Sequence, residues 1–267
     1  MLNVSIVLYN SDTNEVISLV HELRHNPLVK EIFLVDNSKC ATIRYNQLPI
    51  TYIHNAKNIG YGRAHNVALR QTITQNIPYH LVLNSDISFQ SESITQLIDF
   101  MDTNINVGSL MPKIFYPNGK IQYLCKLIPT PFDLFSRRFL PHKWIKNRTK
   151  RFELQDFGYD RIIDIPYLSG CFMLLRTEIL KEVGLFDERF FLYPEDIDLT
   201  RRIHERYRTV FYPNVQVIHA HAHESYKNMW ILWIHVKNII IYFNKWGWFF
   251  DKKRKLINQE ILKQLNK

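Results

Sequence analysis

Cysteine is scarce in this chain of 267 residues, and the few present lack the pattern of a functional site. Cys40, Cys125 and Cys171 are odd in number, far apart and without metal-ligand spacing. Such usage is typical of reduced thiols and predicts a cytosolic location. No signal peptide is expected, because Asn3–Leu8 already has the composition of a strand, with no charged leader before it. With 46% hydrophobic and 13% aromatic residues, disorder is excluded.

Long apolar runs are missing too. The most apolar stretch, Met229–Phe243, is interrupted by His235, Lys237 and Asn238 and is too short to cross a bilayer. The net charge of +9 is unevenly placed, because residues 126–151 and 227–267 each carry +7 and the rest carries −5. A basic face on a mildly acidic body predicts an anionic partner, either nucleic acid or an anionic membrane.

Strand-like and helix-like segments alternate through the first hundred residues. The predicted strands are Val4–Leu8, Glu31–Val35, Thr51–His54 and His80–Asn84, and the predicted helices are Asp12–His25, Arg63–Thr74 and Ser93–Met101. This alternation predicts an α/β fold with a mostly parallel sheet and helices on both faces. Ligands of such sheets bind at the carboxyl ends of the strands.

The second half of the chain is less regular. Residues 129–151 are rich in proline, aromatic and basic residues, which predicts a mobile loop or a loop with short helices. Helices are expected near Thr177 and Glu195, and a long apolar-aromatic helix from about Tyr226 to Phe250. Further strands are expected at Ile162–Leu168, Cys171–Arg176, Val210–Tyr212 and Val215–His219.

Polar and acidic residues follow several of these strands. Val35 leads into Asp36, and Leu83 leads into Asn84 and Asp86. Glu195, Asp196 and Asp198 fall in the first turn of a helix, where the helix dipole favours acids. Three carboxylates so close repel one another, which calls for a metal, a basic partner or a catalytic need.

Two further runs are chemically suggestive. Gly60 and Gly62 precede a helix and could let main-chain N–H groups cradle a phosphate, although the third glycine of the dinucleotide fingerprint is absent. His219, His221 and His223 end a strand at a period of two, which places all three imidazoles on one face. Contact with a metal or a phosphate is therefore expected there.

These segments, in this order, resemble the family 2 glycosyltransferases with the GT-A fold. The resemblance extends from Val4 to about Ser225. It is carried by Tyr9–Asn10, Val35–Ser38, Asn58–Asn66, Leu83–Asp86, Ser169–Arg176, Phe186–Phe191, Glu195–Asp198 and His219. It implies a Rossmann-like, nucleotide-sugar-binding domain with a mixed central sheet over residues 1–225. Residues 226–267 would form a C-terminal amphipathic, basic helical extension that associates with a membrane.

The resemblance also implies roles for particular residues. Asp196 would be the catalytic base of an inverting transfer, and Asp86 with His219 would bind a divalent cation, Mg²⁺ or Mn²⁺. Tyr9, Asp36, Asn66 and Asn84 would contact the nucleotide-sugar donor. The family's metal motif often has a second acid where this chain has Asn84, so Asp86 is expected to hold the metal with less help.

Within the family, the nearest likeness is to bacterial rhamnosyltransferases of O-antigen and capsule assembly, because a tryptophan-rich helix follows His219–Ser225. This likeness implies dTDP-rhamnose or a UDP-sugar as donor and an undecaprenyl-diphosphate-linked saccharide as acceptor. Trp230, Trp233, Trp246 and Trp248, with the basic run Lys252–Lys255, are typical of a helix lying on an anionic membrane. The expected location is peripheral, on the cytoplasmic face of the inner membrane.

Three alternatives remain open at this stage. A hexosyl or galactofuranosyl transferase would share every motif. A nucleotidyltransferase would also place acids around a metal and a nucleotide. A basic nucleic-acid-binding protein fits the pI of about 9.4 but leaves the acidic clusters unexplained, so no nucleic acid is expected as a partner.

Overall fold

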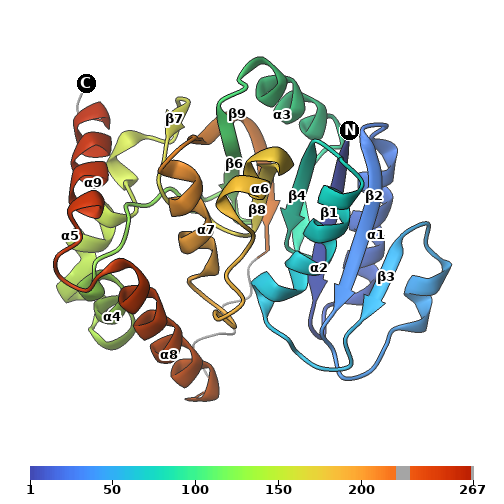
Figure 1. Ribbon diagram of the computed structural model, residues 1–267, viewed down its shortest axis with the longest axis horizontal. Coiled ribbons are helices and arrows are strands. Elements are labelled where there is room, and N and C mark those ends of the chain that lie inside the picture. The colour runs from blue at the N-terminus through green and yellow to red at the C-terminus, as the bar shows by residue number, and fades with distance from the viewer. Residues whose placement is uncertain (221–228, 266–267) are drawn as a thin grey trace.

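The computed structural model describes residues 1–220 and 229–265 (Figure 1). Its first half is β1 (Leu2–Leu8), α1 (Thr13–His25), β2 (Val29–Asp36), β3 (Thr51–His54), α2 (Tyr61–Thr74), β4 (Tyr79–Leu83), β5 (Ile87–Ser88), α3 (Glu92–Thr103) and β6 (Val107–Phe115). The predicted alternation of strands and helices is confirmed. The Asp12 carboxylate caps α1 by accepting the main-chain N–H groups of Asn14 and Glu15.

The second half contributes the remaining elements. They are α4 (Pro131–Phe139), α5 (His142–Phe152), β7 (Ile163–Asp164), β8 (Phe172–Arg176), α6 (Thr177–Val183), α7 (Glu195–His204), β9 (Arg208–His219), α8 (Met229–Trp246) and α9 (Lys252–Leu265). Short 3-10 turns cover Ile43–Gln47 and Gln155–Phe157. The basic segment after Pro129 is thus a pair of short helices, which was one of the two expectations for it.

The strands form one mixed sheet in the order β3-β2-β1-β4-β8-β6-β9-β5, with β7 also paired to β9. The four strands from β3 to β4 are mutually parallel, whereas β8 is antiparallel to both of its neighbours. Alternate residues of β1 pack on opposite faces: Val4 joins the core with α1 and α3, while Ser5 bonds to His65 of α2. The predicted mixed α/β sheet is confirmed.

One detail at the end of the sheet differs from expectation. The segments Val210–Tyr212 and Val215–His219 are one strand, β9, because the register against β6 shifts beyond Tyr212 instead of breaking the ladder. Pro213 and Asn214 lie at this irregularity.

The C-terminal segment is two helices, not one helix reaching Phe250. Helix α8 ends at Trp246, and the next residue, Gly247, has φ +95°, a conformation that favours glycine. Asp251 then caps α9 by accepting the main-chain N–H of Arg254 at 2.9 Å. In Figure 1 α4, α5, α8 and α9 gather at the end of the molecule away from β3.

Both C-terminal helices also join the main core, through Tyr242 and Phe243 of α8 and Ile261 of α9. The expected boundary at residue 226 lies outside the described residues. Among the helices of residues 1–220 and 229–265, none is long and apolar enough to cross a membrane.

Candidate active site

The candidate site lies where β1, β2 and β4 end, beside the first turn of α7. Because β2, β1 and β4 are neighbouring parallel strands, the loops that follow them lie together at one edge of the sheet, the crevice side, where the ligands of such sheets bind. Asp36 closes β2, and Asn84 and Asp86 follow β4. His219 ends β9, which pairs with β5 directly after Asp86.

Asp36 is held in place by neutral partners. Its Oδ2 accepts the Tyr52 hydroxyl at 2.7 Å, and its Oδ1 accepts the main-chain N–H of Ser38 at 2.8 Å. Burial and this hydrogen bond to Asp36 raise the pKa of Tyr52 to about 12, so the phenol stays protonated and keeps donating. Asp36 therefore lies at the strand end where contact with the nucleotide-sugar donor was expected. That contact itself stays a prediction.

Asn84, Asp86 and His219 are brought together by the structure. His219 Nε2 lies 3.2 Å from Asp86 Oδ1 and 3.2 Å from Asn84 Nδ2. The main-chain N–H of Ala220 donates to the Asp86 carbonyl at 3.0 Å, which fixes the loop of Asp86 against the end of β9. His221 and His223 lie outside the described residues.

Gln122 orients His219 and was missed by sequence reasoning. Its Nε2 donates to the His219 carbonyl at 2.8 Å, and its Oε1 lies 2.9 Å from His219 Nδ1. Since an amide oxygen only accepts, Nδ1 must carry the proton, and Nε2 faces Asp86. No pattern around Gln122 in the sequence marks it, because its role depends on chain folding across 97 positions.

The protonation of His219 depends on Asp86. Burial alone would lower the pKa of His219, but hydrogen bonds to Asp86 and Cys171, and the negative charge of Asp86, raise it to about 10. The ring and the Asp86 carboxylate thus form an ion pair whose proton a cation can displace.

Tyr61 connects this group to α7. Its hydroxyl lies 2.9 Å from Asn84 Oδ1 and 2.8 Å from the Gly170 carbonyl, and burial raises its pKa well above the usual value. The N–H of Gly170 donates to Asp196 Oδ2 at 3.1 Å. Asp196 is therefore linked to Asn84 through only two residues, Gly170 and Tyr61, whose hydroxyl contacts both Asn84 and Gly170.

Glu195 and Asp196 are buried carboxyls at the beginning of α7. Burial raises the pKa of Asp196, while N–H groups of Gly170 and Ile197 favour its charged form. Burial and the neighbouring charge of Asp196 raise the pKa of Glu195 to about 8. Its Oε2 is buried and has no hydrogen-bond partner among the described residues. Such perturbed acids concentrate at functional sites.

Asp198, the third acid of the cluster, faces away from the crevice. Its oxygens lie 2.9 Å from Arg202 Nε and 2.7 Å from Lys245 Nζ, and Trp246 Nε1 donates to it at 2.8 Å. The repulsion expected within the cluster is thus relieved by basic partners at Asp198 and by a raised pKa at Glu195.

Tyr9 and Asn66 have contrasting positions. Tyr9 follows β1 with 57% of its surface exposed, so a ligand can reach it. Asn66 is buried, with its amide donating to the Phe186 carbonyl at 2.9 Å and accepting the Phe186 N–H at 3.1 Å. These bonds tie α2 to the segment before α7, and a direct donor contact by Asn66 stays a prediction.

The glycines at the beginning of α2 serve close packing. A Cβ on Gly60 would lie 2.7 Å from the Phe191 carbonyl oxygen, and one on Gly62 would lie 2.8 Å from Phe186 Cβ. The first free N–H of α2, that of Tyr61, already donates to the Phe191 carbonyl at 3.0 Å. The N–H of Tyr61 is therefore not available to an anion, and a phosphate cradle at these glycines stays a prediction.

The residues present fit a hard divalent cation. Asp86 offers a carboxylate with part of its surface exposed, and His219 offers Nε2, with its other ring nitrogen held by Gln122 in the manner of metal-binding histidines. Within residues 1–220 and 229–265, no group of three or more His, Cys, Asp or Glu side chains is arranged so that it could hold a metal ion. Mg²⁺ is typically bound by one or two carboxylates with substrate phosphates completing its shell.

Comparison with known proteins identifies the family. The family model described as "Glycosyl transferase family 2" matches residues 4–184, more than half of the chain. The chain therefore belongs to glycosyl transferase family 2 and is a transferase. The match ends before α7, so the placement of Asp196 depends on the structure and not on that match.

Curated relatives are rhamnosyl- and hexosyltransferases. The N-acetylglucosaminyl-diphospho-decaprenol L-rhamnosyltransferase of Mycobacterium tuberculosis is 26% identical over 209 residues, covering 73% of this chain and 67% of the relative. The Escherichia coli (strain K12) rhamnosyltransferase WbbL is 26% identical over 173 residues, 62% of each chain. The Haloferax volcanii hexosyltransferase Agl10 of low-salt glycan biosynthesis is 24% identical, covering 75% of this chain and 61% of the relative.

Solved structures show the fold. TarS of S. aureus has a TM-score of 0.61 at 17% identity, covering 99% of this chain and 42% of TarS. The mannosyltransferase PcManGT of Pyrobaculum calidifontis, solved with GDP-Man and Mn²⁺, has a TM-score of 0.56 at 15% identity, covering 91% of this chain and 63% of that one. GalNAc-T7, solved with UDP, GalNAc and Mn²⁺, has a TM-score of 0.58 at 16% identity, covering 82% and 43%. The expected GT-A fold is confirmed, and this chain spans less than two thirds of each neighbour.

Proposed function

We propose that this chain is a metal-dependent, inverting rhamnosyltransferase. It transfers L-rhamnose from dTDP-rhamnose to a lipid-linked saccharide during O-antigen or capsule synthesis. The observation that carries the proposal is the position of Asp196, buried beside Gly170, with Asn84, Asp86 and His219 on the other side of Tyr61. The rhamnosyl donor is supported by the names of two relatives.

Asp196 is proposed as the general base. The acceptor hydroxyl is a poor nucleophile, so a carboxylate must take its proton as it attacks the sugar carbon. Burial raises the pKa of Asp196, which makes it a stronger base, while the Gly170 N–H holds one oxygen and fixes the carboxylate. Attack by the acceptor itself, with no covalent sugar–enzyme intermediate, inverts the anomeric configuration.

Asp86 and His219 are proposed to hold the divalent cation, Mg²⁺ or Mn²⁺. When bound, this ion would neutralise the diphosphate charge of the departing nucleotide. Gln122 keeps the His219 ring oriented for this, and Asn84 lies between the ring and the Tyr61 hydroxyl. Tyr9 and Asp36, at the ends of β1 and β2, are proposed to border the nucleobase, with Asn66 supporting the donor side through α2.

The acceptor is proposed to be a saccharide on undecaprenyl diphosphate, reached from the cytoplasmic face of the inner membrane. The mycobacterial relative is named for a diphospho-decaprenol substrate. One stripe of α8 exposes Met229, Trp230, Trp233 and Ile240, an apolar surface suited to a membrane interface. The buried Asn238, on the other side of α8, donates to the Leu192 carbonyl at 2.9 Å and ties the helix to the segment before Asp196.

A panel of nucleotide-sugars tests the proposal. Nucleoside diphosphate release is measured with dTDP-rhamnose, UDP-hexoses and UDP-galactofuranose, each with and without a lipid-linked saccharide. We expect acceptor-stimulated release with dTDP-rhamnose. A preference for a UDP-hexose would favour a hexosyltransferase instead, the second candidate, which the Haloferax relative supports. Release of pyrophosphate would overturn both in favour of a nucleotidyltransferase.

The cation assignment has its own test. Activity should vanish in excess EDTA and return with Mg²⁺ or Mn²⁺. Asp86→Ala and His219→Ala should each raise the metal concentration needed for half-maximal activity, by about tenfold or more. Asp99→Ala, at an exposed position of α3, is the matched control and should leave that metal concentration unchanged. Full activity in EDTA would contradict the assignment, and an effect of Asp86→Ala alone would leave His219 without a metal role.

A further inference from the structure

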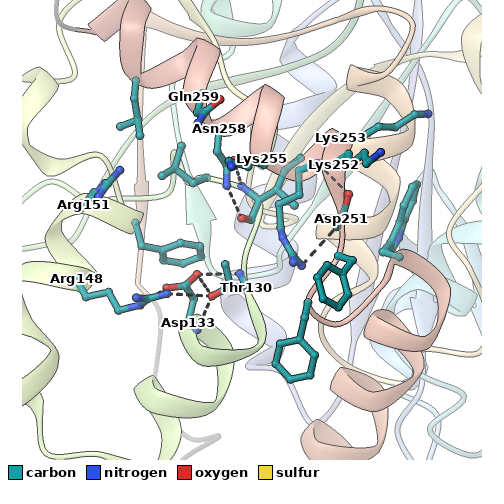
Figure 2. A pocket seen from close by; sticks show the side chains of 18 of the residues that line it. Thr130, Asp133, Arg148, Arg151, Asp251, Lys252, Lys253, Lys255, Asn258 and Gln259 are labelled. Atoms are coloured by element: carbon teal, nitrogen blue, oxygen red, sulfur yellow. Dashed lines mark hydrogen bonds and ion pairs between the residues drawn. The ribbon is translucent and has the colours of Figure 1, made fainter.

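A basic groove lies outside the candidate active site, none of whose residues lines it. It has a volume of about 1240 Å³ and runs between the α4–α5 pair and α9, with the linker 247–251 at one end. Figure 2 shows its two sides, with α5 supplying Arg148 and Arg151 and α9 supplying Lys252, Lys255 and Asn258. The two basic segments of the sequence therefore meet at one place.

The charge of the groove is only partly compensated by the protein. Its lining has six basic residues against two acids, Asp133 and Asp251. Asp133 is already paired with Arg148 at 2.6 Å, and Asp251 with the buried Arg201 at 2.8 Å. Within the described part of the chain, the exposed Arg151, Lys252 and Lys255 have no ion-pair partner.

The six basic residues that line the groove are Arg148, Arg151, Lys252, Lys253, Arg254 and Lys255. Like charges held so close repel one another, and an anion in the groove would remove that repulsion.

The walls of the groove are preformed. Arg254 is buried and donates to the Trp248 carbonyl at 3.0 Å, which fixes the linker to α9. Asn258 accepts the Ile128 N–H and donates to the Ile128 carbonyl, both at 2.9 Å, which joins α9 to the segment before α4. The basic side chains are therefore presented from a fixed frame, with little ordering needed on binding.

The rim of the groove is apolar and exposed. Phe249 and Phe250 line it with 79% and 99% of their surface exposed. Large exposed apolar side chains beside cations are typical of proteins that lie in a membrane interface. A free anion would leave these side chains in water, whereas the acyl region of a bilayer would bury them.

We propose that this groove binds the headgroup phosphate of an anionic phospholipid while Phe249 and Phe250 enter the acyl region of the bilayer. The proposal rests on the membrane part of the proposed function and identifies a docking site for it. It is independent of the sugar transferred, because no residue of the candidate active site lines the groove.

Vesicle sedimentation tests the groove with the full chain. Vesicles of phosphatidylcholine with and without 30% phosphatidylglycerol (about one lipid in three, enough for an anionic surface) are compared at low and high salt. The charge-reversed variant Lys252→Glu/Lys255→Glu should bind anionic vesicles at least about tenfold more weakly. The control Lys30→Glu/Lys181→Glu makes the same change in net charge outside the groove and should change binding less than about twofold by comparison.

A second variant separates the apolar rim from the charge. Phe249→Ser/Phe250→Ser should weaken binding to anionic vesicles while leaving its salt dependence in place. Equal binding of wild type to neutral and anionic vesicles would overturn the proposal, as would an equal loss in the control variant. Loss of DNA binding in the same lysine variant, with unchanged vesicle binding, would assign the groove to nucleic acid.

Transfer to a water-soluble acceptor is measured in parallel. It should be unchanged in the groove variants, because Lys252, Lys255, Phe249 and Phe250 are exposed and none of them belongs to the candidate active site. If wild type shows no glycosyl transfer but the groove variants lose vesicle binding, the enzyme assignment fails and the groove assignment holds. If wild type transfers the sugar but the groove variants bind vesicles as well as wild type does, the enzyme assignment holds and the groove assignment fails.

Discussion

The two sides of α7 treat the carboxylates of its first turn in opposite ways. On the crevice side, Glu195 and Asp196 are buried, and none of the ion pairs of the described residues includes them. On the side that faces α8, Asp198 is also buried but has Arg202, Lys245 and Trp246 around it. Residues two apart on a helix point in different directions, so the two environments coexist within one turn.

This difference separates chemistry from stability. A fold that only needed to stabilise α7 would neutralise all three acids, as it does at Asp198. Burial instead raises the pKa of Asp196 and of Glu195, which costs stability and is expected where a proton must move. The paired side anchors α8 and the linker to α9, where Arg201 stacks on Trp246 at 4.0 Å and pairs with Asp251.

The sharpest contrast should come from Asp196→Asn. The amide keeps the shape of the carboxylate but cannot accept the acceptor's proton, so transfer should fall by on the order of 10²–10⁴-fold. Donor binding should survive, because the change is neutral in volume. Steady-state transfer and donor titration measure both. Near-normal turnover would remove Asp196 from the role of base.

On the other side of the helix, Asp198→Ala should act on stability. It leaves Arg202 and Lys245 facing one another without their shared acid, and breaking such a buried pair costs about 3–5 kcal/mol. Urea denaturation gives the free energy of unfolding. The control is Asp156→Asn, which breaks the exposed pair with Lys150 and should cost less than about 1 kcal/mol. Similar losses of unfolding free energy in Asp198→Ala and Asp156→Asn would contradict the stabilising role of the ion pairs of Asp198.

Much of the fold follows from local patterns in the sequence. The strands of the parallel half, such as Thr51–His54, and the Asp12 cap of α1 were predictable because apolar periodicity and capping depend on neighbours in the chain. The break after α8 was not predicted. Gly247 and Asp251 signal it, but the tryptophans on both sides favoured one continuous helix.

The candidate site was predictable only as a set of strand and helix ends. Sequence could bring Asn84, Asp86 and His219 to one edge of the sheet, but not the contacts of Gln122 or Tyr61, which come from distant segments. The three acids of α7 could not be told apart, because their difference depends on which neighbours pack against each side of the helix. The meeting of both basic segments at α9 was likewise hidden.

A smaller effect concerns the pH dependence of stability through Glu195. Its pKa is raised from 4.5 to about 8 in the folded state, so the native protein binds the proton more tightly than the unfolded chain does. The free energy of unfolding should therefore fall as pH rises from about 4.5 to about 8. Glu195→Gln lacks this loss and should gain in melting temperature over wild type at pH 8.5 but not at pH 4.5, conditions at about the two ends of that window.

Glu188 provides the opposite sign within the same region. Burial would raise its pKa, but hydrogen bonds from Arg70 and Asn66 lower it. Stability from this group is present above the unfolded pKa and lost as pH falls. Glu188→Gln should therefore lose melting temperature at neutral pH and lose less in acid. The same pH trend in both variants would show that a general charge effect, not local burial, sets the slope.

The smallest change, a single methyl group, tests how finely the crevice side is positioned. A Cβ on Gly170 would lie 3.3 Å from Asp196 Cβ and 3.5 Å from Tyr61 Cε1, so the carboxylate must shift by a few tenths of an ångström. Since a misplacement of about 1 Å can cost about 100-fold, Gly170→Ala should lower kcat by roughly three- to tenfold. Ser169→Ala, which adds no atom to the same turn, should leave kcat near normal. The melting temperature of Gly170→Ala should stay close to that of wild type, because Asp198 and its partners are untouched. A large loss of stability with unchanged kcat would show that Gly170 matters for packing and not for the position of Asp196.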